Sequence, residues 1–480
     1  MRKNILLILI IFILTTKTFS IIIEDKINAK SKLVEVNKLI NEKKYEEAIS
    51  ILNNIFEKLG DTEFASFVNY YLAIIEFNKK NYYKAFYFIE SALNDNKFYL
   101  VSKENKIKMK LLYAMICYKL DMIDNAISYF KEVRDYSIVY KDEVNLYLSE
   151  IYFRKKDDKN SASYYFKYIN VNKLSSDQQY LYYYLENFLL WSQIDTSNIN
   201  YRDPNINSLL VDKDNLYIGL WNGGLILYNY ILESYNVISL SQYTSEEIRA
   251  LWRDNRRIYV GTTNGVAIID KRNGSIKNEE TLTNVSITSI SGNDDTVYYG
   301  TIGKGLICKD KNDNQFFQII DNENISALYY ANSSLYIGTY NGNVYKYEND
   351  NLIKLTELSF LNKAITSFLL DGSNLWITTH GQGIVLYNTH KKKIKIYSTK
   401  TKEIGNDFIL CSTIKDDRIY FGTLGNGIIF FDKNVNKFNN FKISDMYITN
   451  EIRSIQFSEE FMFIGTLGYG VLQKRLIIED

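Results

Sequence analysis

One phrase recurs seven times in the C-terminal part of the chain, and its spacing limits the fold more than any other feature. Each copy has an apolar–aromatic–apolar run, then Gly-Thr, a polar turn and a second apolar run, as in LYIGTYNGNVYKYE from Leu335. The copies begin at Leu216, Ile258, Val297, Leu335, Leu375, Ile419 and Met462. A repeat of about 40 residues indicates an array of equivalent modules.

Four positions keep their register in every module. A Gly ends the aromatic run in six copies, and Thr378 replaces it in the fifth. Thirteen residues earlier stands an Ile in each copy: Ile206, Ile248, Ile287, Ile325, Ile365, Ile409 and Ile452. Two residues after the Ile the side chain is small: Ser208, Ala250, Ser289, Ala327, Ser367, Cys411 and Ser454. Two residues before the Gly position it is aromatic: Tyr217, Tyr259, Tyr298, Tyr336, Trp376, Tyr420 and Phe463.

Each module reads as four short strands, because apolar residues alternate and polar turns separate the runs. Four-stranded modules at this period are typical of propeller blades. We therefore predict an all-β seven-bladed propeller over residues 192–480. The small residues would fit the crowded axis, the aromatic residues would wedge between blades, and Gly would allow a positive φ. Thr378 then means either that its position needs no positive φ or that the fifth blade differs locally.

The last module is one strand short. After Gly470 the residues VLQKRLIIED supply only a third strand, which would leave an open sheet edge. The segment Ser192–Asn200 is long enough to be the missing strand. We predict that it pairs with the residues after Val471 and closes the ring.

The blade phrase resembles the two-component regulator propeller repeat. The match is best at Leu375-Trp376-Ile377 and at Gly422-Thr423 with Gly425 and Gly427, and it covers residues 206–475. In that family such blades form extracellular or periplasmic sensor parts of receptors, often read as carbohydrate-responsive. The chain has one ring without a following membrane span, kinase or DNA-binding part, so we expect the blade type to carry over and the receptor role not to.

The N-terminal part, residues 24–191, predicts an α-solenoid of paired helices. Apolar faces at helical spacing occupy 25–41 with 45–58, 63–78 with 82–94, 104–119 with 122–135, 142–155 with 158–170, and a last helix at 177–191. A small residue recurs in each second helix: Ala48, Ala85, Ala126 and Ala162. The phrases YEEAISIL, YYKAFYFIESAL, IDNAISYF and NSASYYF resemble tetratricopeptide repeats, although Val36 and Glu150 replace small residues. The resemblance implies a groove that binds a peptide or protein partner.

The first twenty residues predict a signal peptide. Arg2 and Lys3 precede an apolar stretch from Ile5 to Leu14, and Thr18 and Ser20 supply the small residues of a cleavage site. The stretch would span about 15 Å as a helix, against about 30 Å for a bilayer core. We expect export to the periplasm or cell envelope, cleavage near Ser20 and no transmembrane span in the mature chain. Retention of the segment as an anchor is the alternative.

The composition and motifs give little indication of catalysis or of nucleic-acid, metal or cofactor binding. The net charge of +1 and the absence of basic clusters argue against a nucleic-acid partner. With two His residues and no metal, nucleophile or phosphate-loop motif, we expect no metal, no cofactor and no enzyme. The catalytic alternative is a propeller lyase or hydrolase that uses His380. Cys117, Cys308 and Cys411 lie too far apart on such a fold to pair, which predicts unpaired, mostly buried thiols.

The turns between second and third strands gather aromatic and amide side chains on one face of the ring. Such side chains suit sugar or peptide recognition, although turns also favour Asn for backbone reasons. The candidate ligand-binding residues are Trp221, Asn222, Asn264, Tyr340, Asn341, His380, Gln382, Asn426 and Tyr469. The sequence thus predicts a non-enzymatic envelope scaffold for protein partners, with glycan or small-ligand sensing through the propeller face as the alternative.

Overall fold

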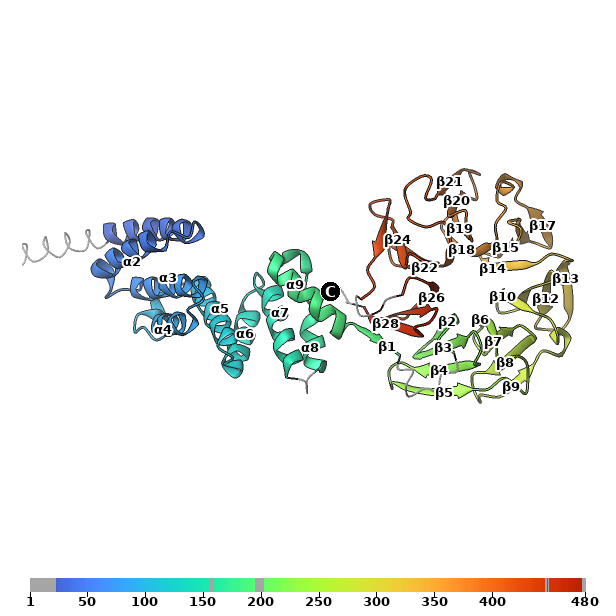
Figure 1. Ribbon diagram of the computed structural model, residues 1–480, viewed down its shortest axis with the longest axis horizontal. Helices are drawn as coiled ribbons and strands as arrows, with labels where there is room; N and C mark the ends of the chain where they lie inside the picture. The colour runs from blue at the N-terminus through green and yellow to red at the C-terminus, as the bar shows by residue number, and fades with distance from the viewer. Residues whose placement is uncertain (1–22, 156–158, 195–202, 445–446, 448, 477–480) are drawn as a thin grey trace, which may run out of the picture. The chain divides into compact units, whose positions relative to one another are not determined.

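The computed structural model describes residues 23–155, 159–194, 203–444, 447 and 449–476. The predicted signal peptide and its cleavage site lie outside these residues. The chain divides into two compact units after Leu185, one helical and one built of strands (Figure 1). None of the described helices is long and apolar enough to cross a membrane.

The N-terminal unit consists of helices that follow one another in pairs (Figure 1). Residues 23–41 form the first helix. The others are α2 (Tyr45–Leu59), α3 (Phe64–Asn78), α4 (Tyr82–Leu93), α5 (Lys103–Lys119), α6 (Ile123–Tyr136), α7 (Lys141–Arg154), α8 (Lys159–Phe166) and α9 (Ser176–Leu189). The recurrent Ala48, Ala85, Ala126 and Ala162 are all fully buried. A side chain this small lets neighbouring helices approach closely, which explains why it returns in each second helix.

The C-terminal unit is a ring of seven four-stranded antiparallel sheets, which confirms the predicted propeller (Figure 1). Six blades use consecutive strands, in order from the axis outward. They are β2 (Ile206–Asp212), β3 (Asn215–Leu220), β4 (Leu225–Asn229) and β5 (Ser234–Ile238); β6 (Ile248–Arg253), β7 (Arg257–Thr262), β8 (Gly265–Asp270) and β9 (Ile276–Asn278); β10 (Ile287–Gly292), β11 (Thr296–Thr301), β12 (Leu306–Asp310) and β13 (Phe316–Ile320); β14 (Ile325–Ala331), β15 (Ser334–Thr339), β16 (Val344–Glu348) and β17 (Asn351–Lys354); β18 (Ile365–Asp371), β19 (Asn374–Thr379), β20 (Ile384–Asn388) and β21 (Ile394–Tyr397); β22 (Ile409–Lys415), β23 (Arg418–Thr423), β24 (Ile428–Asp432) and β25 (Lys437–Phe441).

The seventh blade combines both ends of the ring. It contains β26 (Ile452–Phe457), β27 (Phe461–Thr466), β28 (Val471–Arg475) and, as its outer strand, β1 (Trp191–Gln193). β1 pairs antiparallel with β28, Trp191 opposite Lys474, so the predicted closure is confirmed. The last helix ends at Leu189 and not at residue 191, because Trp191 already belongs to β1 and is buried in the propeller beside Phe441. Residues 195–202 of the predicted strand lie outside the described chain.

The aromatic residue of each second strand wedges between blades, as predicted. All seven are buried. Trp376 of the fifth blade lies 5.7 Å from Phe421 and 4.9 Å from Phe431 of the sixth, between ring centroids. Phe463 of the seventh blade meets Tyr230 of the first at 5.1 Å, so the ring closes through the same kind of contact.

The Gly before the last residue of the second strand, present in six blades, does not have the predicted role. None of the six adopts a positive φ. A Cβ on Gly338 would instead lie 2.5 Å from the Cβ of Ile365, the first residue of the next blade's inner strand. The same contact recurs in the pairs Gly219–Ile248, Gly261–Ile287, Gly300–Ile325, Gly422–Ile452 and Gly465–Ile206. The recurrent Gly and the recurrent Ile are therefore two halves of one steric contact between blades. Positive φ values occur in the turn that follows, for instance at Gly383.

The same observation explains why Thr378 can replace the Gly in the fifth blade. Its position needs no positive φ, so a β-branched residue is acceptable where local space allows. The side chain is fully buried, and its Oγ1 lies 2.7 Å from Thr366 Oγ1 and 2.6 Å from Ser367 Oγ. Thr366 Oγ1 in turn donates to the carbonyl oxygen of Ile409 at 2.7 Å. The fifth blade thus has a buried hydroxyl network at the position where the other six blades have the Gly–Ile contact.

Candidate functional site at the mouth of the central channel

Every inner strand of the propeller begins with a β-bulge. The pairing with the second strand shifts between the recurrent Ile and the small residue two positions later, in all seven blades. A bulge leaves one residue out of the ladder and re-aims its side chain. We call these the bulge residues: Asn207, Arg249, Thr288, Ser326, Thr366, Leu410 and Arg453. All seven line the same cavity, so the bulge brings one side chain from each blade to the axis.

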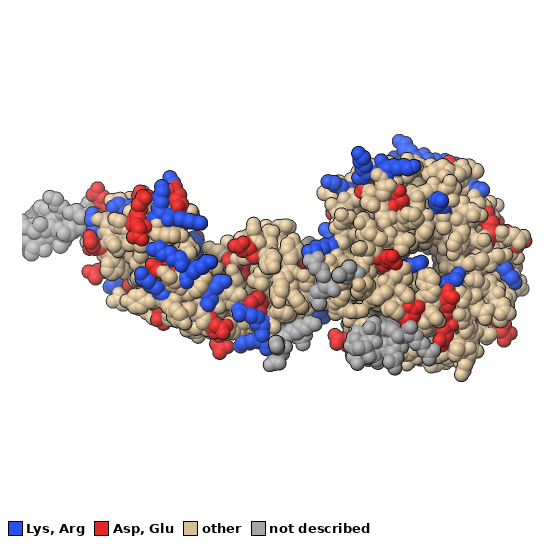
Figure 2. All heavy atoms as spheres, viewed as in Figure 1, with Lys and Arg blue, Asp and Glu red and all other residues tan. Residues whose placement is uncertain are grey.

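The cavity is the mouth of the central channel and has a volume of about 470 Å³. This size lies within the range of about 300–1,000 Å³ that is usual for ligand pockets. The bulge residues share the lining with Trp221, Glu247, Tyr340, Ala364, Ile365 and His380. Figure 2 shows a hollow at the centre of the propeller, with acidic and basic side chains at its edge. The site therefore combines a defined space with charged, polar and aromatic walls.

Three bulge side chains are used to hold the ring together. Asn207 Nδ2 donates to the carbonyl oxygen of Ile248 at 2.8 Å, and Thr288 Oγ1 donates to that of Ile325 at 2.6 Å. Thr366 makes the equivalent bond to Ile409. In each case the acceptor is the recurrent Ile of the next blade. One donor group of each of these three residues is therefore already bonded to backbone.

The two arginines of the ring have different surroundings. Arg249 Nη2 donates to Glu247 Oε1 at 3.1 Å, so its charge is balanced within the site. The guanidinium of Arg453 lies over the Trp221 ring, 5.1 Å from the centroid, and its Nε is buried without a hydrogen-bond partner among the described residues. Burial lowers the pKa of Arg453, and the charge of Glu451 offsets this only in part. Arg453 is thus a partly desolvated cation to which no acidic side chain of the described residues is directly bound.

Large apolar side chains surround this mouth. Trp221, Ile302 and Tyr340 occupy the same turn slot, because the backbone N–H of each donates to the residue just before the recurrent Ile of its own blade. Phe408 joins them through its bridge to His380. The four side chains are 40–44% exposed, and we call them the apolar rim. The apolar rim therefore lies beside the charged side chains of the cavity.

The structure brings three of the predicted site residues together in the cavity lining: Trp221, Tyr340 and His380. The His380 ring also meets Phe408 edge-on at 5.1 Å. Gln382 lies outside the lining, and its Oε1 accepts the backbone N–H of Asn362 and of Lys363. The remaining predicted residues are exposed turn residues outside the lining: Asn222, Asn264, Asn341, Asn426 and Tyr469. A binding role for these stays a prediction.

The arginines were missed by the sequence reasoning. The one available signal was the position directly after each recurrent Ile, which carries Arg in two of the seven copies. A long charged side chain beside the most crowded strand of a blade needs space, and the axis is where a propeller offers it. Among the described residues no group of three His, Cys, Asp or Glu side chains is arranged to hold a metal ion.

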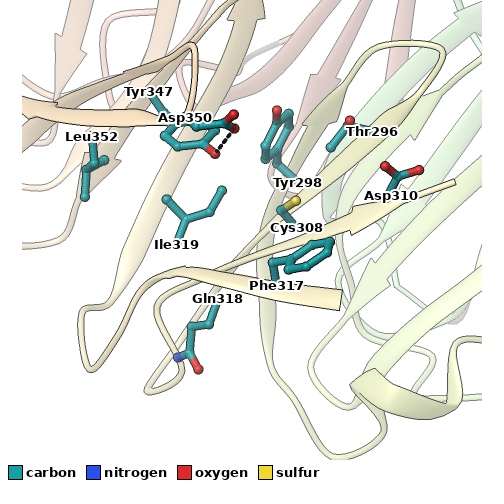
Figure 3. A pocket seen from close by; sticks show the side chains of 10 residues that line it. All are labelled: Thr296, Tyr298, Cys308, Asp310, Phe317, Gln318, Ile319, Tyr347, Asp350 and Leu352. Atoms are coloured by element: carbon teal, nitrogen blue, oxygen red, sulfur yellow. Dashed lines mark hydrogen bonds between the residues drawn. The ribbon is translucent and has the colours of Figure 1, made fainter. Parts of the chain in front are cut away.

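A second cavity, of about 480 Å³, lies between the third and fourth blades (Figure 3). Its walls carry Tyr298, Cys308 and Phe317 from one blade and Tyr347 from the other, whose hydroxyl donates to Asp350 at 2.9 Å. A cavity of about 470 Å³ occupies the corresponding seam between the first and second blades, with Tyr217 in the place of Tyr298. Because the space recurs at equivalent seams, it follows from blade geometry and does not indicate a dedicated site.

The three thiols are free, Cys117 fully buried and Cys308 and Cys411 partly buried. Burial raises the pKa of Cys117 and of Cys308 to about 11 and that of Cys411 to about 12. At pH 8 a thiol with a pKa near 11 is about one part in a thousand thiolate, against about a quarter at the ordinary value near 8.5. We expect the folded protein to react slowly with Ellman's reagent at pH 8, Cys308 first because it lines the seam.

A time course with the wild type and with Cys308→Ser tests this expectation, and the variant should lack the earliest phase. The rate should rise as the pH approaches the raised pKa values, because the thiolate is the reacting form. In denaturant all three thiols should react promptly. A fast phase in the folded wild type, or fewer than three reactive thiols after unfolding without a reductant, would contradict it.

Comparison with known proteins gives structural neighbours only. No family model and no curated protein matches the chain. The extracellular domain of a protein described as a hybrid two component system from B. thetaiotaomicron is 20% identical with a TM-score of 0.51, and the match covers 60% of this chain and 40% of that one. A second such domain from this organism is 17% identical with a TM-score of 0.49, over 59% and 41%.

The WD40 propeller of Doa1 is also similar, at 12% identity and a TM-score of 0.45, over 56% of this chain and 92% of that one. The chain spans about 40% of the length of the two B. thetaiotaomicron domains. At these identities the similarity shows the propeller fold and no function.

Proposed function

We propose that the protein is an exported, non-enzymatic interaction protein whose propeller face binds a protein partner. The observation that carries the proposal is the apolar rim. Four large apolar side chains, three of them aromatic, are 40–44% exposed; two of them, Trp221 and Tyr340, line the cavity. Exposed apolar groups gathered at one place mark contact surfaces, and aromatic residues dominate the binding energy of protein interfaces.

The helical unit supplies a second contact surface in this proposal. Its helix pairs recur like those of solenoids, whose stacked repeats form an extended groove. The resemblance to tetratricopeptide repeats implies a peptide or protein ligand in such a groove. The two units together make the chain a scaffold that joins partners in the cell envelope.

A glycan or small ligand at the channel mouth is the second candidate. The observations that favour it are the volume of about 470 Å³ and the presence of Trp221 and Tyr340 in the lining. Aromatic faces with nearby polar groups are common in such sites. Under this candidate the propeller would sense a soluble molecule and the helical unit would contact the protein that responds to it.

Capture from envelope extract with the full chain tests the proposal. Wild type, the double variant Trp221→Ala/Tyr340→Ala and the control Tyr235→Ala, which alters an aromatic of similar exposure on β5, are compared. We expect one or more proteins bound by wild type and Tyr235→Ala and lost from the double variant. Equal capture by all three would contradict a role of the rim.

The same proteins on a glycan array distinguish the second candidate. Glycan binding that needs Trp221 and Tyr340, without a captured protein, would replace the first proposal. His380→Ala is included because a propeller lyase would lose turnover of a bound glycan with this variant. Under the interaction proposal neither wild type nor this variant turns over a glycan.

A further inference from the structure

We infer that the protein partner of the propeller presents an acidic side chain flanked by apolar residues, and that its carboxylate enters the channel mouth and pairs with Arg453. The inference rests on the proposed function and names the chemistry of the partner at that site.

The charge balance of the bulge ring leads to this partner. Arg249 is bound by Glu247, whereas Arg453 has the Trp221 ring on one side and a buried Nε without a partner. The acidic residue whose charge reaches Arg453 is Glu451, and the structure shows no ion pair between them. A cation withdrawn from water without an anion is costly, and a guanidinium matches a carboxylate in geometry as well as charge. A carboxylate from outside would complete the site.

The remaining polar groups of the ring argue against a sugar. A sugar ring needs several hydrogen-bonding side chains, but Asn207, Thr288 and Thr366 already donate to backbone carbonyls of the next blade. In the lining, Ser326 Oγ and Arg453 Nε are the buried side-chain atoms without a partner among the described residues. Arg453 is then the cation of the lining that no carboxylate of the described residues binds, which suits a single carboxylate and is too little for a polyanion such as nucleic acid.

The apolar rim favours a partner in which the residues next to the acidic residue are apolar. Trp221 and Tyr340 line the mouth, Ile302 occupies the same turn slot in the third blade, and Phe408 contacts His380 of the lining. A ligand that covers these side chains would desolvate them. Apolar residues on either side of the acidic residue would cover them, and exclusion of water would strengthen the ion pair at the centre. An isolated small carboxylate would leave the rim exposed. The occupant that satisfies both features is an acidic peptide segment with apolar flanks.

The test is a selection from a phage-displayed library of random heptapeptides on the full chain, followed by fluorescence polarisation with the enriched peptides. We expect Asp or Glu beside aromatic or aliphatic residues. Replacing that acid by its amide, or Arg453 by Gln, should each weaken binding at least about tenfold, and the two changes together should cost little more than either alone. Arg453→Lys should retain part of the affinity. Thermal melts of the variants check that the propeller remains folded.

Arg256→Gln is the matched control, since Arg256 is an exposed arginine paired with Asp270 in the turn between β6 and β7. It should bind like wild type. Failure to enrich acidic peptides, or equal binding by Arg453→Gln, overturns the inference. Arg453-dependent binding of oligogalacturonate in place of peptides overturns it in favour of an acidic glycan.

The outcome also separates this inference from the proposed function. A captured protein that needs Trp221 and Tyr340 but tolerates Arg453→Gln leaves the proposed function standing and removes the acidic contact. Loss of capture by Arg453→Gln together with acidic peptides supports both. Absence of any partner that depends on the rim removes both.

Discussion

Deletion of residues 471–480 should unfold the propeller and leave the helical unit folded. These residues contain β28, which pairs with β27 on one side and with β1 on the other. Val471 and Leu472 are fully buried. Without β28 the seventh blade keeps two strands and β1 has no partner, so the ring is open and a sheet edge is exposed. Because each blade packs on the next, we expect the loss to spread around the whole ring.

Two spectroscopic signals can follow the two units separately. All four Trp residues lie in the propeller unit, so their fluorescence reports on it alone: Trp191, Trp221, Trp252 and Trp376. The far-UV circular dichroism of helices reports mainly on the other unit. We expect the fluorescence transition to shift to much lower temperature or to disappear, while the helical signal still melts cooperatively.

A deletion of residues 477–480 is the control, because it leaves β28 in place. It should melt like the wild type. An unchanged fluorescence transition in the 471–480 deletion would show that closure by β1 and β28 is not what holds the ring.

The propeller could be predicted from the sequence because the same residue types recur at the same spacing in seven modules. Each blade has an Ile at the start of its inner strand, a small residue two positions later and an aromatic residue at the seam, so the register can be read without a structure. The role of the Gly was not visible. A Gly next to a turn is typical of a turn former, and its steric partner, such as Ile365 for Gly338, lies three strands further along the chain.

The candidate site was predictable only where it depends on turns. Trp221, Tyr340 and His380 were found because strand–turn–strand units place their turns on one face. Arg249 and Arg453 were missed for a physical reason. In a regular strand, alternation sends the residue between the Ile and the small residue to the opposite face of the sheet. A bulge breaks that alternation, and a bulge of this kind cannot be predicted from the type of residue that occupies it.

Exchanging Gly338 for Thr should destabilise the propeller more than exchanging Thr378 for Gly, although the two positions are equivalent in neighbouring blades. A Cβ at position 338 would lie 2.5 Å from the Cβ of Ile365, so the inner strand of the fifth blade would have to move. Overpacking of this kind costs about 1–3 kcal/mol or more. Thr378→Gly loses hydroxyl contacts with Thr366 and Ser367, which we place at about 1–2 kcal/mol. Urea unfolding followed by Trp fluorescence measures both.

A second substitution decides whether the clash with Ile365 is the cause. Ile365→Ala alone should cost about 2–5 kcal/mol, because it leaves a cavity in the seam. In the Gly338→Thr background the same change removes the atoms that clash, so the double variant should be more stable than the sum of the two losses predicts. Additive losses would place the effect of Gly338 elsewhere. A Gly338→Thr loss no larger than that of Thr378→Gly would mean that the recurrent Gly is not needed for the approach of the next blade.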